Sequence, residues 1–188
     1  MTTSNPIPGD LAASGQADAS TPGGERADLL AMLAARRHFL RFTTRGLTDE
    51  QARQRTTVSE LTLGGLVKHV AHTEATWADF VVQGPGVMAG PDDPQQMAKW
   101  AEEFRMGPEE TLDSVLAHYE EVARRTDELV RTLPDLDASQ PLPEAPWFEP
   151  GATRSARRVF LHIVAETAQH AGHADILRES IDGQKTMG

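Results

Sequence analysis

One stretch of the sequence places ionisable side chains at the spacing that metal sites on helices use. The segment from His162 to His173 contains Glu166 and His170, which are four residues apart. Side chains four residues apart lie one above the other on one face of a helix, so this carboxylate and imidazole can bind the same metal ion. His162 falls at the edge of that face, which makes it a candidate for an alternative ligand or for a hydrogen bond to one.

The same segment places these groups within an apolar stripe. On a helix with about 100° per residue, Val159 and Leu177 share one angular position, and Glu166 and His170 each fall within about 20° of it. Burying a carboxylate or an imidazole is costly unless the group is paired or bound to a ligand. An ordinary helix pair explains a surface position well and a core position badly, so the pattern favours a metal site.

A metal site in a helical bundle needs a further ligand from a facing helix. The segment 63–83 offers His69 and His72. His72 falls opposite the apolar stripe of this segment, on the solvent side, whereas His69 lies on the margin of the stripe and is the preferred candidate. Glu74 falls inside the stripe, where we expect its buried carboxylate to hydrogen-bond an imidazole.

Helical periodicity predicts the elements that position these groups. Thr62 is a favourable N-cap, and Pro134 and Gly183 are favourable stops. No alternating strand pattern is present. We therefore predict an all-α, up-down four-helix bundle with long connections, whose helices span 25–44, 63–83, 108–133 and 154–181, with a shorter helix over 96–104.

The rest of the chain divides into tails and connections. Residues 1–24 are rich in Ser, Thr, Gly and Pro and predict a disordered tail, residues 25–183 the bundle, and residues 184–188 a C-terminal tail. The connection 47–61 has its own caps, and two long loops cover 84–94 and 134–153. In the second loop, Trp147 and Phe148 are interpreted as anchors that cover one end of the bundle.

The basic residues at the start of the last helix have two readings. Arg154, Arg157 and Arg158 open this helix, where the helix dipole disfavours cations. They can hold an anionic group of a substrate or form a solvated face, and the solvated face is the preferred interpretation.

Composition excludes several classes of function. The chain of 188 residues has 18 Lys+Arg against 28 Asp+Glu, a net charge of -10, which disfavours binding to nucleic acid or to anionic lipid. It contains no cysteine, so disulfides, thiolate metal sites and a cysteine nucleophile are excluded. The N-terminal residues lack the features of a signal peptide, and no apolar run is long enough to span a membrane, so we expect a cytoplasmic protein.

Two stretches carry a resemblance to a known family. The sequences GLTDEQARQRTTVSELTLGGLVKHVAHTE and HIVAETAQHAGHADILRESIDG resemble the DinB-like superfamily of four-helix bundle metalloproteins, in its actinobacterial branch. The resemblance implies one divalent metal ion, zinc in the first place and nickel as the alternative, bound by His69, Glu166 and His170. Many relatives have histidine in place of Glu166, and the His-Glu-His form is similar to that of mycothiol-dependent maleylpyruvate isomerases. His173 stands where many relatives have glutamine, beside the ligands.

The resemblance also implies a function. Better understood members use low-molecular-weight thiols, so we expect a metal-dependent thiol S-transferase that uses mycothiol on small electrophiles, with Glu74 or His173 orienting ligands or moving a proton. A divalent metal ion makes a bound thiol a thiolate, which is the nucleophile. The alternatives are a non-catalytic metal-binding stress-response protein and a metal-dependent hydrolase. The expected partners are a small-molecule thiol and an electrophile, without nucleic acid or membrane, and a homodimer is one oligomeric state open to such a bundle.

Overall fold

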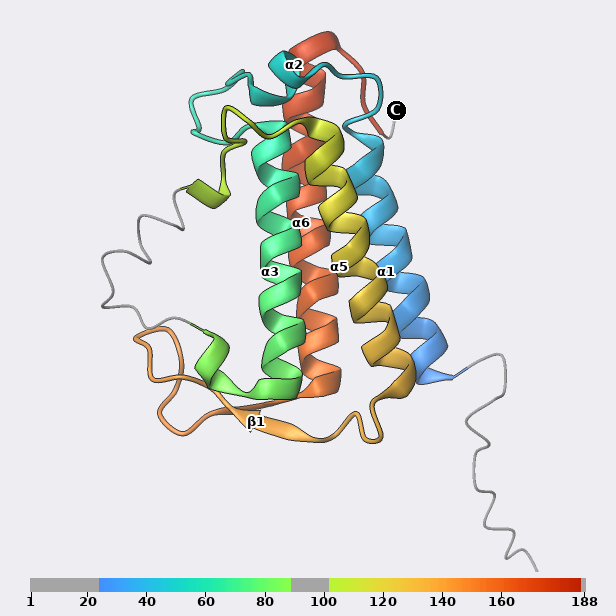
Figure 1. Ribbon diagram of the computed structural model, residues 1–188, viewed down its shortest axis with the longest axis vertical. Coiled ribbons are helices and arrows are strands. Elements are labelled where there is room, and N and C mark those ends of the chain that lie inside the picture. Colours follow the sequence, from blue (N-terminus) through green and yellow to red (C-terminus); the bar gives the residue numbers. More distant parts are fainter. Residues whose placement is uncertain (1–23, 89–101, 187–188) are drawn as a thin grey trace, which may run out of the picture.

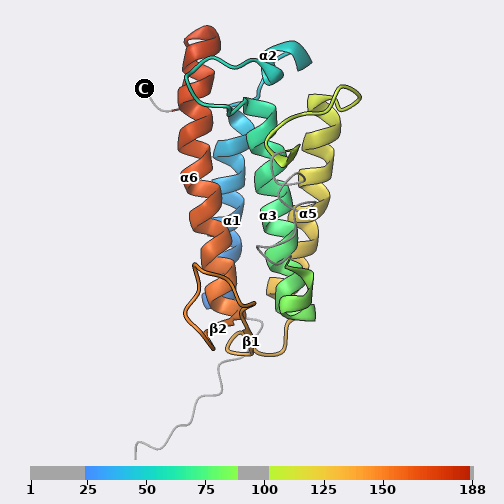
Figure 2. The same ribbon diagram turned by 90° about the vertical axis from the view of Figure 1, so that its left-hand side faces the viewer.

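The protein is a bundle of four long helices. The computed structural model describes residues 24–88 and 102–186. The long helices are α1 (Glu25–Phe42), α3 (Leu63–Gln83), α5 (Leu112–Thr132) and α6 (Ala156–Asp182). Helix α6 packs between α1 and α3, and α3 packs between α6 and α5 (Figure 1, Figure 2). The predicted all-α bundle is confirmed, whereas the N-terminal tail and most of the short helix predicted over 96–104 fall outside the described residues.

The helices do not simply alternate in direction. Lys68, near the start of α3, contacts Glu110 just before α5 at 2.8 Å, and Arg125 of α5 contacts Asp79 near the end of α3 at 3.2 Å. Helices α3 and α5 therefore run parallel, and both are antiparallel to α1 and α6 (Figure 1). The order is up, down, down, up, which differs from the alternating order of an up-down bundle and follows from the long connection between α3 and α5.

Side-chain caps fix where three helices begin. Thr62 Oγ1 accepts a hydrogen bond from the backbone N–H of Gly65 at 3.2 Å, which confirms the predicted start of α3. Helix α5 begins at Leu112 and not near Pro108, because Thr111 caps it in a reciprocal capping box with Ser114. Helix α6 begins at Ala156, two residues later than predicted, because the residues before it belong to a strand and Ser155 Oγ caps the helix by accepting a hydrogen bond from the backbone N–H of Arg158 at 3.3 Å.

Short elements close the two ends of the bundle. Helix α2 (Asp49–Arg53) lies in the predicted connection at one end, and a 3₁₀ turn, η1 (Pro85–Val87), follows α3 at the other. Strand β1 (Ser139–Pro141) pairs antiparallel with β2 (Thr153–Ser155) at the η1 end (Figure 1). The prediction of no strand is wrong in this detail, because three-residue strands are too short to produce an alternating pattern.

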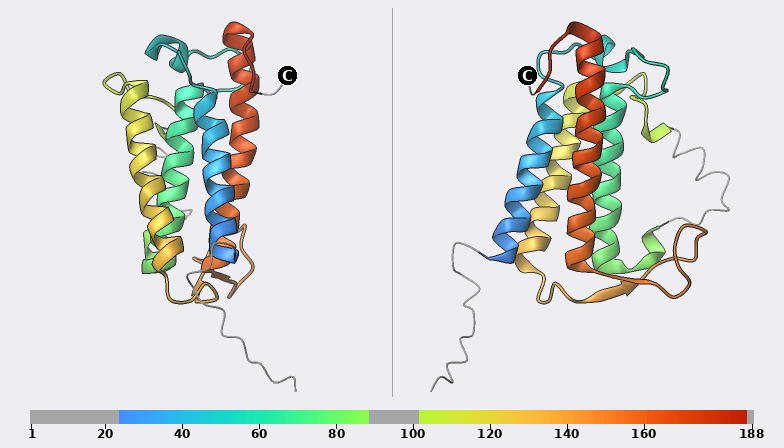
Figure 3. Two further views of the ribbon diagram at one scale, coloured as in Figure 1. Left: turned by 90° about the vertical axis from the view of Figure 1, so that its right-hand side faces the viewer. Right: turned by 180° about the vertical axis from the view of Figure 1, so that it is seen from behind.

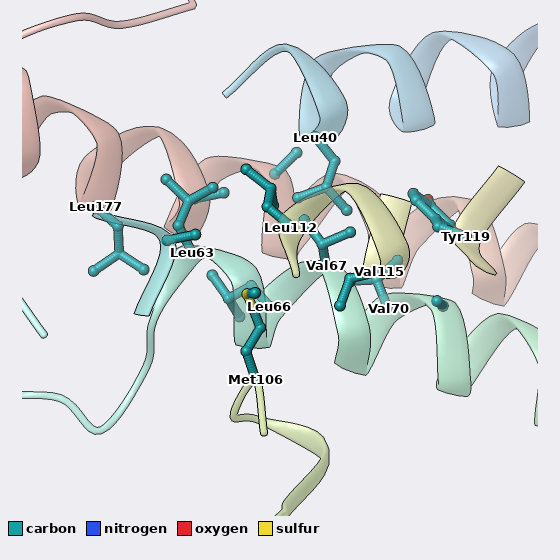
Figure 4. Packing of buried hydrophobic residues seen from close by; sticks show 14 residues of the cluster. Leu40, Leu63, Leu66, Val67, Val70, Met106, Leu112, Val115, Tyr119 and Leu177 are labelled. Atoms are coloured by element: carbon teal, nitrogen blue, oxygen red, sulfur yellow. The ribbon is translucent and has the colours of Figure 1, made fainter. Parts of the chain in front are cut away.

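Two hydrophobic clusters fill the bundle, with polar side chains between them. The cluster at the α2 end packs residues of all four long helices, including Leu40, Val67, Val115 and Leu177 (Figure 4). The cluster at the strand end is built around Leu33, Trp77, Phe80, Phe160 and Ile163. The buried polar side chains between the clusters are Arg37, Glu74, Thr126 and Thr167.

No helix in the described part of the chain is both long enough and apolar enough to cross a membrane.

Candidate functional site

Helices α3 and α6 lie next to each other along one side of the bundle (Figure 3). A cavity of about 510 Å³ lined by residues of both helices opens there. His69 and His72 of α3 and His162 and Glu166 of α6 face it. Its walls also include the residues after α3, the segment before α5 and the loop between the two strands. The lining residues are His69, His72, Thr73, Thr76, Trp77, Val87, Met88, Glu103, Pro143, Ala145, Trp147, Phe148, Arg154, His162 and Glu166.

The structure brings the three predicted metal ligands together. The rings of His69 on α3 and His170 on α6 meet edge to face, with centroids 4.9 Å apart. The Nε2 atom of His170 lies 3.6 Å from the Oε2 atom of Glu166. Because α3 and α6 are antiparallel, residues distant in the sequence converge here. His170 therefore contacts both an imidazole on α3 and a carboxylate on its own helix.

His69 is held in an apolar setting. Its ring stacks on Phe104 with centroids 3.9 Å apart, and Gly65 lets this segment approach α3, because a side chain there would meet the Phe104 carbonyl oxygen at 1.9 Å. Burial, together with the imidazoles of His170 and His72, lowers the pKa of His69 to about 4. The ring is therefore neutral at pH 7, and its buried Nδ1 atom has no hydrogen-bond partner.

The structure corrects the predicted position of Glu166 and His170 on α6. The side chain of Glu166 is 31% exposed and that of His170 is 12% exposed, so the group does not lie in the middle of the buried face. Thr167, Ala171 and Ala174 are buried and shift this face away from the large aliphatic residues that defined the predicted stripe. Glu166 instead borders the cavity, where it is open to a ligand.

His162 contacts Glu166, and His173 contacts His170. The Nε2 atom of His162 lies 3.8 Å from the Oε1 atom of Glu166, and its ring packs edge to face on Trp77. The Nδ1 atoms of His173 and His170 lie 3.5 Å apart. Burial lowers the pKa of His162, and burial together with His173 lowers that of His170.

Sequence reasoning missed a carboxylate at the cavity wall. The Oε1 atom of Glu103 lies 3.0 Å from the Nε2 atom of His72, which is half-exposed, as its predicted solvent position required. Burial raises the pKa of Glu103 to about 7, although Lys68 opposes this, and burial lowers the pKa of His72. No motif marks Glu103, since it precedes α5 and reaches α3 only through the fold.

Glu74 does not support an imidazole, and this prediction is wrong. Its carboxylate accepts two hydrogen bonds from Arg37 of α1, one from Nε at 3.1 Å and one from Nη2 at 2.5 Å. Arg37 also donates to Asp127 of α5 at 2.7 Å. Glu74 is buried, as its predicted place inside the apolar stripe of α3 required, but its partner is the guanidinium of Arg37 and not an imidazole.

The three arginines before and in the first turn of α6 have different surroundings. Arg157 pairs with Glu25 and Asp137, and Arg158 is exposed, so these two form a solvated face as predicted. Arg154 instead lines the cavity. Its guanidinium lies over Trp77 at 4.6 Å and over Phe148 at 5.5 Å from the ring centroids.

Two imidazoles and one carboxylate are donor types that a divalent metal ion accepts, and one pair of them has a suitable spacing. No three His, Asp or Glu side chains of the described residues are arranged so that they would hold a metal ion as they stand. Two ligands of one zinc ion at the tetrahedral angle are about 3.4 Å apart, which is close to the 3.6 Å between Glu166 and His170. The ring of His69, which contacts that of His170, has a buried Nδ1 atom without a hydrogen-bond partner.

The fold and the site define a class of protein, an all-α bundle with a cavity lined by histidine and glutamate between two antiparallel helices. The sequence matches the family described as Mycothiol-S-transferase over residues 28–183, so the chain belongs to the mycothiol S-transferase family. This membership confirms the resemblance to thiol-using bundles of the DinB-like type. A comparison with curated proteins gives no match.

Proposed function

We propose that the protein is a metal-dependent transferase that joins the sulfur of mycothiol to small electrophiles. The observation that carries the proposal is the contact of His170 with both His69 and Glu166, which themselves line the cavity between α3 and α6. Membership of the mycothiol S-transferase family supports mycothiol as the thiol substrate. Because the chain has no cysteine, the reacting sulfur belongs to the substrate.

His69, Glu166 and His170 would hold the metal ion, zinc in the first place with nickel as the alternative. The lowered pKa of each imidazole keeps both rings neutral at pH 7, as metal binding requires. Glu166 contributes the negative charge of the set. The chemistry that a divalent ion supplies at such a site is a lowered pKa of a thiol ligand.

The other residues of the cavity position the substrates. His173 orients the ring of His170 through the contact between their Nδ1 atoms. The apolar side chains of Trp77, Val87 and Phe148 exclude water from the sulfur. The His72–Glu103 pair opens onto the same space and can accept the thiol proton, either on the imidazole of His72, whose lowered pKa favours the neutral form, or on the carboxylate of Glu103, whose pKa of about 7 leaves a substantial fraction ionised at pH 7.

The reaction converts a thiol and an electrophile into a thioether. With 1-chloro-2,4-dinitrobenzene as the probe, the sulfur forms a bond to the ring carbon, the carbon–chlorine bond breaks, chloride leaves with the electron pair, and the thiol proton is released. Mass spectrometry of the thioether and the release of chloride measure this reaction directly.

The test is turnover of the zinc-supplemented full chain with mycothiol and this probe. We expect conjugation faster than the uncatalysed reaction and faster than with glutathione, because a site shaped for the sugar gains binding energy that the tripeptide lacks. His170→Ala should abolish the catalysed rate, and His38→Ala, an exposed histidine on α1, should not. If the chain hydrolysed an ester or amide and showed no thiol-dependent turnover, the proposed transferase would be rejected in favour of a hydrolase. If it bound metal and catalysed neither reaction, it would be a metal-binding protein without catalytic activity.

A further inference from the structure

Arg154 places a positive charge inside the cavity. It lies in β2, two residues before α6, and its guanidinium lies over the rings of Trp77 and Phe148. Cation–π contacts use the faces of the guanidinium plane and leave its edges for hydrogen bonds. The edges are where a carboxylate binds an arginine.

Arg154 forms no ion pair within 4 Å among the described residues, although the charge of Glu166 acts on it from further away. Its Nε and Nη1 atoms are out of contact with solvent and have no hydrogen-bond partner. Arg157, three residues further on, is by contrast paired with Glu25 and Asp137. A shielded cation without a partner costs free energy, and an anion in the cavity would remove that cost.

The cavity also indicates which anion fits. Arg154 is the single Arg or Lys among the described lining residues, so the cavity offers one cation to pair with a carboxylate, and the acidic side chains of Glu103 and Glu166 disfavour a second negative charge on the ligand. The walls beside Arg154 are formed by Trp77, Trp147 and Phe148. Flat aromatic ligands pack well on such rings.

We propose that Arg154 binds the carboxylate of an aromatic, singly charged electrophile, and so selects the second substrate of the transferase. This inference rests on the proposed function. The sugar of a sugar-linked thiol carries no charge, so the anionic group belongs to the electrophile. Trp77 links this place to the metal group, because its ring lies 4.6 Å from the Arg154 guanidinium and 4.7 Å from the ring of His162, and His162 in turn lies 3.8 Å from Glu166.

A matched pair of electrophiles tests the reaction. In 4-chloro-3-nitrobenzoate the sulfur of mycothiol replaces chloride at the ring carbon, chloride leaves with the electron pair, and the thiol proton is released. The amide 4-chloro-3-nitrobenzamide undergoes the same substitution without the charge. Each catalysed rate is divided by its uncatalysed rate, which removes the difference in intrinsic reactivity between the two compounds.

A binding measurement keeps the inference independent of turnover. Calorimetry of the full chain uses 3-nitrobenzoate and 3-nitrobenzamide, which lack the leaving chloride. We expect the wild-type chain to bind the benzoate at least about tenfold more tightly than the amide, as a charge-assisted hydrogen bond provides. Arg154→Gln should remove this preference, Arg154→Lys should keep part of it, and Arg158→Gln, which removes an exposed charge four residues away, should leave it unchanged.

The outcomes separate this inference from the proposed function. Equal affinity for benzoate and amide, or a preference that survives Arg154→Gln, would overturn the role of Arg154. Unchanged binding of the amide shows that the variants are folded. If the benzoate preference depends on Arg154 while no conjugate forms with either electrophile, the carboxylate site stands and the transferase proposal falls.

Discussion

Arg37 of α1 and Glu74 of α3 form a buried two-point ion pair in the centre of the bundle, with nitrogen–oxygen distances of 3.1 and 2.5 Å. The pair lies between the two hydrophobic clusters and extends to Asp127 of α5. It therefore joins three of the four long helices close to the turn of α3 that carries His69.

Removing one partner of the Arg37–Glu74 pair should lower the free energy of unfolding far more than removing both partners. Arg37→Met leaves the Glu74 carboxylate buried and unpaired, so we expect the free energy of unfolding to fall by about 3–5 kcal/mol. The double variant Arg37→Met/Glu74→Leu should recover most of this loss. The control is Arg41→Met, which removes the exposed pair with Glu120 and should cost less than about 1 kcal/mol. Urea unfolding curves measure all three, and equal losses for Arg37→Met and Arg41→Met would contradict the assignment.

Two glycines should respond to alanine in opposite ways. A Cβ atom at Gly65 would meet the Phe104 backbone, so Gly65→Ala should cost about 1–3 kcal/mol and displace the ring that covers His69. The pKa of His69, measured by NMR titration, should then rise from about 4 towards 6.5. Gly172 on α6 has nothing within 4 Å of such an atom, so Gly172→Ala should stabilise the helix by about 0.5–1 kcal/mol. An unchanged His69 titration in Gly65→Ala would show that Phe104 does not shield the ring.

The sequence predicts the helices well because helical periodicity and caps are local signals. Thr62 and Gly84 mark the start and end of α3 at the positions that the structure shows. The phase of α6 was set too far towards its large aliphatic residues, because small buried residues such as Ala171 and Ala174 carry little hydrophobic signal. The predicted stripe therefore placed Glu166 deeper than it lies.

The side-chain partners were less predictable than the helices. Arg37 meets Glu74, and Glu103 meets His72, only because the fold brings distant segments together. Neither pair has a spacing that a single helix or motif could reveal. Arg154 was recognised as a candidate for an anionic group, but its position in the cavity depends on the strand pairing of β2, which three residues do not signal.

The pKa of Glu103 predicts a pH-dependent effect of its removal. In the folded chain burial raises this pKa from 4.5 to about 7, so the folded state binds more protons than the unfolded state between these values. The stability contributed by the protonated carboxyl group is therefore lost as the pH rises through 7. Glu103→Gln should raise Tm relative to wild type by about 3 °C more at pH 8 than at pH 5.

The neighbouring Glu102 provides the control for this measurement. It is exposed, so the Tm difference between Glu102→Gln and wild type should be the same at both pH values. If Glu103→Gln behaved in the same way, its carboxyl group would be ionised throughout and would not serve as a proton acceptor of raised pKa.

Metal binding should distinguish His72 from the proposed ligands His69 and His170. His170→Ala and His69→Ala should lose most of the bound zinc, whereas His72→Ala, which loses only its contact with Glu103, should keep it. Metal affinity should also fall as the pH drops through the range in which imidazoles become protonated. Elemental analysis of the purified variants measures the zinc content, and equal losses of zinc in His69→Ala and His72→Ala would contradict the proposed ligands.

The most direct test of the central claim is the rate of mycothiol conjugation as zinc is returned to the chelator-treated chain. If His69, Glu166 and His170 form one catalytic metal site, the rate with 1-chloro-2,4-dinitrobenzene should rise linearly from the uncatalysed value and level off at one equivalent of zinc per chain. A metal-free chain that conjugates mycothiol at the full rate, or a zinc-loaded chain that does not exceed the uncatalysed rate, would contradict the account.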